Sequence, residues 1–312
     1  MATTVKKAPA DKLVYNKHNK IKGRLSTRVT DWIIYLILGL LALCTVAPFL
    51  YVTAGSLATE KELTERAFFV IPKVISFNAY QYIWKTGTIF RGLRNSLFVT
   101  IFGTIINMIF TTTFAYPLSK KDFKGRNLIL NLVIVTMLFS GGMIPSYLLI
   151  RNLGWLDSYL ALTVPGAISA FNMIIVKNFF QELPIELEEA ARIDGCNDIG
   201  IFRKIVLPLS KPVLASIGLF YAVGHWNDYF GSMIYLNTNS KYTVQMILRQ
   251  IVLMAQGIQT DGTMIDYNMA GPPPDQSVKM AATVVATLPI LLVYPFLQKH
   301  FAKGVMVGSV KG

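Results

Sequence analysis

Long apolar runs separated by short polar connections dominate this chain. The hydrocarbon layer of a bilayer is about 30 Å thick and a helix rises about 1.5 Å per residue, so about 20 mainly apolar residues are needed to cross it. Six runs reach that length: Asp31 to Ala54, Leu93 to Leu118, Asn127 to Ile150, Leu156 to Phe180, Pro212 to Leu236 and Met280 to Leu297. The pattern predicts an all-α integral membrane protein with six transmembrane helices.

Two of these runs are interrupted by residues that disfavour a straight helix. Ser140-Gly141-Gly142 and Pro145 fall in the third run, and Pro165 falls in the fourth. Transmembrane helices tolerate Gly and Pro where neighbouring helices satisfy the freed backbone groups. We therefore expect kinked spans at both places.

The polar connections divide the chain into a basic arm, a membrane domain and a short tail. The expected organisation is an arm at 1–30, a six-helix domain at 31–300 with external segments at 55–92 and 237–279 and a cytoplasmic loop at 182–211, and a tail at 301–312.

Composition excludes a soluble domain. Hydrophobic residues make up 53% of the 312 residues, charged residues 15%, and the mean hydropathy is +0.47. One soluble core cannot hide so much apolar surface.

The basic residues give the orientation. Of the 30 Lys and Arg, 20 fall on the side of the amino-terminal arm and 10 on the other. The positive-inside rule therefore places both termini and the loop at 182–211 in the cytoplasm. The net charge of +13 is mostly this topology signal, and attraction to anionic lipid explains the basic arm better than a nucleic acid does, because Tyr15 is its only interleaved aromatic.

Export signals and cysteine chemistry are not indicated. The first run is longer than a typical signal core, and Leu43 before Cys44 argues against cleavage or lipidation there. Cys44 and Cys196 are expected to form neither a disulfide nor a metal site.

The connection from Glu182 to Pro208 is the one long charged insert between apolar runs. Pro184 suits a first helical turn, and Glu186, Glu188 and Glu189 favour the positive end of the helix dipole. Asp194-Gly195 ends that helix, because Gly accepts a left-handed conformation. A second helix can start at Asn197 or Asp198 and run to Leu207. The pattern predicts two short helices joined by a turn, which is also typical of an ordinary amphipathic loop.

Chemical motifs for catalysis are missing. The sequence has no Gly-Lys dipeptide, hence no phosphate-binding loop for ATP, and no HExxH or nucleophile-elbow motif. His18, His225 and His300 are scattered. We expect this chain to be no enzyme and to bind no metal or cofactor.

The cytoplasmic loop nevertheless resembles a known family. Glu189-Ala190-Ala191, Asp194-Gly195 and Leu207-Pro208 match the EAA loop of permease subunits in binding-protein-dependent ABC importers, especially the maltose-type sugar permeases. Further pieces agree: Phe77-Asn78-Ala79-Tyr80, Asn95-Ser96, Trp226-Asn227-Asp228, Phe301-Ala302-Lys303-Gly304 and Val310-Lys311-Gly312.

The resemblance implies a type I ABC importer permease fold in a bacterial cytoplasmic membrane. It implies that the loop is a coupling helix seated in a separate ATPase, which binds ATP and Mg²⁺, and whose motion switches the spans between inward-open and outward-open states. The coupling residues it implies are Glu188, Glu189, Ala190, Ala191, Asp194, Gly195 and Pro208. Other implied partners are a second, different permease subunit, an extracellular solute-binding protein docked on the external segments, and an oligosaccharide, with complex or uronate-bearing glycans the nearest match.

Polar residues inside the spans are candidates for the substrate pathway, because they are costly in lipid. They are Asn107, Asn131, Trp226, Asn227 and Asp228. Trp226 could stack on a sugar ring, with its two neighbours bonding hydroxyls, or it could pack within span five. Asn107 and Asn131 more often make interhelical hydrogen bonds.

The alternative is a secondary transporter or channel that works without ATP. It predicts inverted repeats and ionisable residues paired across spans, yet only His225 and Asp228 lie more than one helical turn inside a predicted span.

Overall fold

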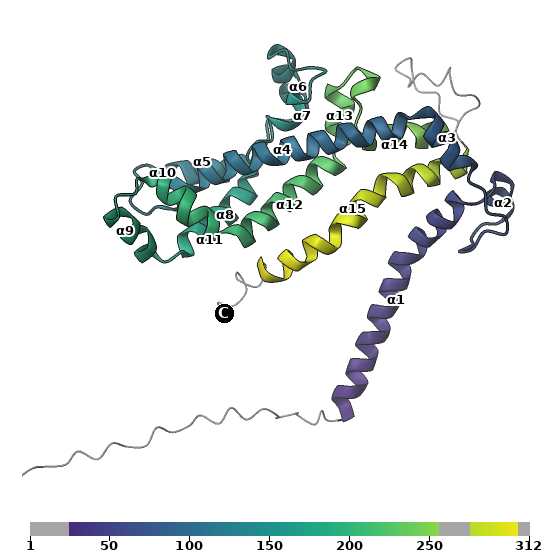
Figure 1. Ribbon diagram of the computed structural model, residues 1–312, viewed down its shortest axis with the longest axis horizontal. Helices are drawn as coiled ribbons and strands as arrows, with labels where there is room; N and C mark the ends of the chain where they lie inside the picture. The colour runs from purple at the N-terminus through teal and green to yellow at the C-terminus, as the bar shows by residue number, and fades with distance from the viewer. Residues whose placement is uncertain (1–24, 256–274, 305–312) are drawn as a thin grey trace, which may run out of the picture. The chain divides into compact units, whose positions relative to one another are not determined.

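The computed structural model describes residues 25–255 and 275–304, and within them every regular element is helical (Figure 1). Residues 1–24, 256–274 and 305–312, which hold most of the predicted basic arm, part of the second external segment and most of the tail, lie outside the described residues. An all-α fold was predicted from the hydropathy pattern, and it is confirmed.

Three helices are long and apolar enough to cross a membrane unbroken. They are α1 (Leu25–Ser56), α4 (Thr88–Ser119) and α15 (Gln276–Gly304). They contain the first, second and sixth predicted spans. Up to five spans result if each of two bent helix pairs crosses once, so the predicted count of six is not reproduced by length and composition alone.

The third and fourth predicted spans are broken rather than kinked. In the third, α5 (Arg126–Leu138) and α6 (Met143–Asn152) differ by 113° in direction across Gly142, which has a φ of +85°. In the fourth, α7 (Leu160–Thr163) and α8 (Ala170–Glu182) are separated by the stretch around Pro165. A Gly at positive φ leaves the helical region altogether, so the helix ends at Gly142, and the expectation of a kinked but continuous span is wrong.

The fifth predicted span is also shorter than expected. Helix α12 (Lys211–Asn227) ends at Asp228, and a separate helix α13 (Phe230–Tyr235) follows. The Asp228 side chain accepts a hydrogen bond from the Gly231 N–H at 2.8 Å, which starts the new helix by satisfying a free amide.

The chain divides into two units, residues 1–50 and 51–312. In the first unit, the described side chains of α1 from Thr30 to Leu50 are exposed or nearly so, although they are strongly apolar. An unpacked apolar cylinder of this kind requires lipid or another subunit around it.

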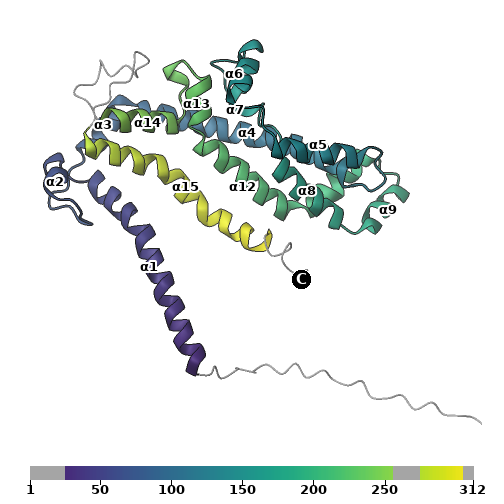
Figure 2. The same cartoon turned by 180° about the vertical axis from the view of Figure 1, so that it is seen from behind.

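The second unit is organised around α4, which packs against α8, α12 and α14 (Val244–Ala255), while α15 packs on α12 and α14 (Figures 1 and 2). The buried face of α4 carries small and polar residues at helical spacing: Gly92, Asn95, Ser96, Val99, Gly103, Asn107, Thr111 and Ala115. Small residues let membrane helices approach closely, since lipid already solvates the apolar ones. A Cβ on Gly103 would lie 2.5 Å from the His225 ring, so Gly is required where α12 crosses α4.

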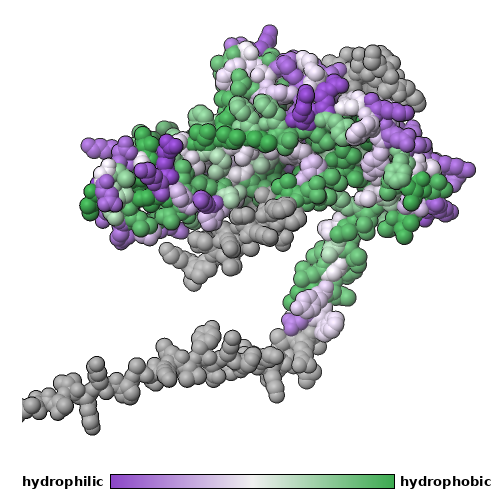
Figure 3. Space-filling model, viewed as in Figure 1, coloured by the Kyte–Doolittle hydropathy of each residue, from purple (hydrophilic) through white to green (hydrophobic). Residues whose placement is uncertain are grey.

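Buried apolar residues form two main clusters in this unit, one around Ile247, Trp226 and Ala282 and one around Met173, Val206 and Ile217. Figure 3 shows hydrophobic residues along the middle of the unit and hydrophilic ones around α9 and α10 and around α2 and α3. That distribution suits a protein whose two ends meet water.

The two segments expected to be external contain α2 (Glu60–Glu65), α3 (Asn78–Thr86) and η2 (Asn239–Lys241). Asn95 donates to the carbonyl oxygens of Ser240 and Tyr242 at 2.8 and 3.0 Å, and so fastens the connection before α14 onto α4.

Candidate functional site

The charged connection between α8 and α12 folds as two short helices with a turn, as predicted. Helix α9 (Ile185–Ile193) begins after Pro184 and carries Glu186 and Glu188 in its first turn. It ends at Asp194, and Gly195 follows with a φ of +81°. That conformation is strained for any residue with a Cβ, so the turn requires glycine at position 195.

The second helix starts where expected but continues differently. The Asn197 side chain caps α10 (Asp198–Ile201) by accepting from the Gly200 N–H at 2.8 Å. A π-helical turn, η1 (Phe202–Val206), and α11 (Leu207–Leu209) continue it. Pro208 has no N–H to donate, so the α-helical hydrogen-bond ladder is interrupted here. The chain then bends by 82° into α12.

This loop packs tightly onto the adjacent ends of the long helices. Ile201 and Val206 are fully buried in one cluster with Ala115 and Leu118 of α4 and with Phe180 of α8. This close packing joins the loop to the ends of α4 and α8.

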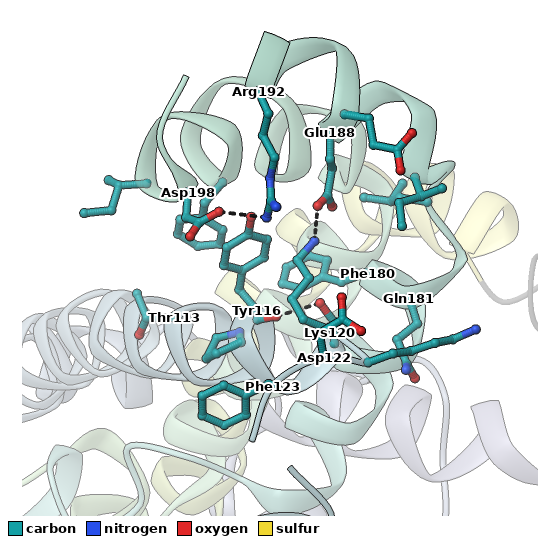
Figure 4. Close-up of a pocket in the computed structure, with 18 residues that line it drawn as sticks. Thr113, Tyr116, Lys120, Asp122, Phe123, Phe180, Gln181, Glu188, Arg192 and Asp198 are labelled. Carbon is teal, nitrogen blue, oxygen red and sulfur yellow. Dashed lines mark hydrogen bonds and ion pairs between the residues drawn. The ribbon is translucent and has the colours of Figure 1, made fainter. Parts of the chain in front are cut away.

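Two ion pairs brace the loop (Figure 4). Lys120, at the end of α4, pairs with Glu188 of α9 and lies 4.6 Å above the Tyr116 ring. Arg192 of α9 pairs with Asp198 of α10 at 3.0 Å. The first pair is largely buried and joins α9 to α4. The second is exposed and joins α9 to α10, so it does not fix α9 on α4.

A cavity of about 1040 Å³ lies between α9, α10 and the end of α4. Aromatic and charged side chains line it, as Figure 4 shows for Phe180, Glu188 and Asp198. Among the described residues, no group of three or more His, Cys, Asp or Glu side chains could hold a metal ion.

The outer surface of α9 is apolar and acidic. Ile193 is 87% exposed and Ile185 64%, at the same helix face as the exposed Glu189. Exposed aliphatic side chains on a rigid element mark a protein-binding surface. Neither isoleucine is among the predicted coupling residues, although both have i, i+4, i+8 spacing with Glu189 in the sequence.

The predicted coupling residues separate into two groups. Glu189, Ala190, Asp194, Gly195 and Pro208 are exposed, whereas Glu188 and Ala191 are buried. Ala191 packs inside this chain, one helical step away from Ala190, so only Ala190 of the two lies on the exposed face of α9.

The predicted pathway residues are not brought together. Asn107 is buried: its Nδ2 donates to the Gly166 carbonyl at 2.6 Å and its Oδ1 lies 2.6 Å from His225 Nε2. This confirms the interhelical role. Asn131 is exposed on α5.

Trp226, Asn227 and Asp228 also take different positions. Trp226 is 7% exposed and packs in the cluster with α14 and α15, which favours the packing role over a sugar contact. Asn227 is exposed, and Asp228 is partly buried as the cap described above.

The helical fold and the exposed apolar surface define a multi-pass membrane protein. Residues 21–307 match the model of the family described as binding-protein-dependent transport system inner membrane component, and the chain belongs to that family.

Several relatives cover nearly the whole chain. The protein LplC of Bacillus subtilis (strain 168) is 53% identical over 299 residues, 96% of this chain and 99% of its own. The polygalacturonan/rhamnogalacturonan transport system permease protein YtcP of the same organism is 52% identical over 288 residues, 92% and 100%. The arabinooligosaccharides transport system permease protein AraQ, also from that organism, is 30% identical, covering 88% and 93%.

A solved structure agrees with the fold. A chain of a bacterial ABC transporter involved in the import of the acidic polysaccharide alginate superposes with a TM-score of 0.81 and 32% identity, covering 89% of this chain and 99% of its own. The protein is thus an ABC importer permease by fold as well as by sequence.

Proposed function

We propose that this chain is one of two permease subunits of an ATP-driven importer of acidic, uronate-bearing oligosaccharides. The observation that carries the substrate class is that a polygalacturonan/rhamnogalacturonan permease and an alginate importer, both concerned with acidic glycans, match nearly the full chain. Exposed cations on the external side, Arg94, Arg151 and Arg249, would raise the local concentration of such anions.

The coupling mechanism rests on α9. In the proposed complex, the exposed Ile185, Glu189, Ala190 and Ile193 seat in a cleft of the ATPase, which binds ATP and Mg²⁺. Glu188 does not touch the ATPase but holds α9 on α4 through Lys120. Closure of the ATPase would then move α9, α4 and α8 as one body.

A second, homologous permease would cover surface that is apolar and unpacked in this chain. Helix α5 buries no side chain completely, and Leu128, Leu132 and Leu138 are each more than half exposed. We propose a heterodimer whose halves enclose the substrate pathway between them, with the solute-binding protein on the external side and both termini in the cytoplasm.

Transport by the assembled importer in proteoliposomes tests both the proposed substrate class and the dependence on ATP. Galacturonate oligosaccharides should be taken up only when the ATPase, ATP and a binding protein are present, and neutral galactose oligosaccharides of equal length should not. Uptake driven by an ion gradient with this chain alone would contradict the mechanism and support the secondary transporter.

A second substrate class is a neutral oligosaccharide, favoured by the similarity to the arabinooligosaccharide permease. ATP-dependent uptake of arabinose oligosaccharides in preference to galacturonates would select it while leaving the coupling mechanism intact.

A further inference from the structure

The connection between α2 and α3, residues 66–77, exposes large apolar side chains in an unusual concentration; we call it the apolar loop. Its exposed members are Phe68 at 58%, Ile71 at 77%, Val74 at 60%, Ile75 at 63% and Phe77 at 56%. A contiguous apolar surface of this kind marks contact with lipid or with another protein.

Hydrogen bonds fix the conformation of the apolar loop. Glu62 of α2 is buried, and its carboxylate accepts from the Lys73 backbone N–H at 3.0 and 3.1 Å while pairing with Arg66. The Ser76 N–H donates to the Leu57 carbonyl at 2.8 Å. Hydrogen bonding from the Lys73 backbone holds the pKa of Glu62 below its usual value. The backbone of the loop is therefore tied to α2 through Lys73 and to the end of α1 through Ser76.

Aromatic contacts set the depth of the loop. Phe68 stacks on Tyr51 of α1 with ring centroids 5.5 Å apart, and Phe69 meets the same ring edge-on at 5.7 Å. Tyr51 lies within the apolar stretch Thr30–Ser56, five residues before its end, which is about 7.5 Å along a helix. The apolar loop thus folds back beside the end of span one instead of projecting into water.

We propose that the apolar loop inserts its side chains into the outer leaflet, at the boundary between headgroups and acyl chains, with phospholipid as its occupant. The depth of Tyr51 matches the roughly 5–10 Å to which interfacial segments bury their apolar side. Irregular backbone is excluded from the hydrocarbon centre, but at this boundary water remains available, and the Glu62 carboxylate satisfies the Lys73 N–H.

Charge and aromatic placement support lipid rather than a soluble protein. Arg66 and Lys73 at the base of the loop suit lipid phosphates. Trp84, at the end of α3 and just before α4, is 74% exposed and meets Phe90 edge-on at 5.1 Å. Exposed Trp at the end of a span is typical of the membrane interface. The loop then anchors the outer end of span one and is removed from the surface on which a binding protein could dock.

Depth-dependent quenching tests the insertion. In the importer purified with its partner subunits, Cys44→Ser and Cys196→Ser remove the native thiols, and Ile71→Cys carries an environment-sensitive fluorophore. In proteoliposomes its emission should shift to the blue and be quenched by phospholipid with a nitroxide high on the acyl chain, but hardly by iodide. Ser240→Cys, an exposed site in η2, should show the opposite pattern.

A second variant tests whether Glu62 holds the apolar loop in the inserted position. Glu62→Ala should release the apolar loop, so that the Ile71→Cys probe loses much of its lipid quenching while co-purification with the partner subunits persists. Strong iodide quenching at residue 71 would overturn the proposal, and so would protection from both quenchers, which would indicate a protein contact. The outcome does not depend on which sugar is transported.

Discussion

At the scale of single residues, polar side chains in this protein fasten segments far apart in the sequence. Asp157, in the connection before α7, has a φ of 56° and accepts from the Asn237 and Thr238 N–H groups at 3.0 and 2.9 Å. Lys241 Nζ lies 2.8 Å from the same carboxylate. Burial alone would raise the pKa of Asp157, but these bonds from Lys241, Thr238 and Asn237 together hold it well below its usual range.

Replacing Asp157 by Asn should therefore destabilise the protein in a pH-dependent way. The unfolded carboxyl has a pKa of about 3.9, so the stabilisation is complete above that value and is lost as the pH falls towards the lower folded pKa. We expect a loss of about 1–3 kcal/mol at pH 7. Thermal unfolding in detergent should show the gap between wild type and variant narrowing below about pH 4. A gap independent of pH would show that the charge is irrelevant.

Trp226 gives a second prediction at this scale. Because Trp226 is buried among α14 and α15 residues, Trp226→Ala should open a cavity and cost about 3–5 kcal/mol. The measurement is the Tm in detergent together with sugar-stimulated ATPase activity of the assembly. Trp84→Ala, at an exposed site, is the control and should change the Tm little. An unchanged Tm with altered sugar stimulation would restore the pathway role.

At the scale of elements, the turn between α9 and α10 depends on one glycine. Gly195→Val should abolish ATP-driven uptake but leave membrane insertion intact, because a β-branched residue resists the φ of +81°. Gly39→Val in α1 is a matched control: an added Cβ there meets nothing within 4 Å, and φ is not positive. Normal uptake by the Gly195 variant, measured in proteoliposomes, would show that the turn is not needed for coupling.

The Lys120–Glu188 pair joins α4 to α9 and should matter for force transmission. Lys120→Met or Glu188→Gln should weaken the coupling between the ATPase and the membrane helices by roughly 0.5–2 kcal/mol. The measurement is the amount of sugar transported per ATP hydrolysed, which should fall. The exchanged pair Lys120→Glu with Glu188→Lys should recover part of the loss. Equal losses in the exchanged and single variants would indicate a role for each side chain apart from the pair. Arg192→Met, at the exposed pair, is the control and should have a smaller effect.

At the scale of the whole molecule, topology is the property that most needs measurement. Cys196 is partly exposed beside the α9–α10 turn, so a membrane-impermeant maleimide should label it in inverted vesicles and not in intact spheroplasts. Cys44→Ser removes the other thiol, which lies in α1. Labelling from the outside would reverse the orientation inferred from the basic residues.

Much of this architecture was readable from local sequence. The apolar length of the runs predicted α1, α4 and α15, and Pro184, Gly195 and Asn197 predicted the limits of α9 and α10. Local signals succeeded there because helix length, capping and positive φ depend on neighbouring residues only. The breaks at Gly142 and Pro165 were located correctly, but their size was underestimated.

Sequence by itself thus determined the membrane class, the helical content and the place of the two-helix charged loop, since each follows from composition, periodicity and backbone chemistry. Tertiary structure alone decided that Ala191 turns inward, that Asn107 meets His225 and that Lys120 meets Glu188. The last two pairs are 118 and 68 residues apart in the chain. Which distant side chains meet depends on how the helices cross, and no local pattern records that geometry.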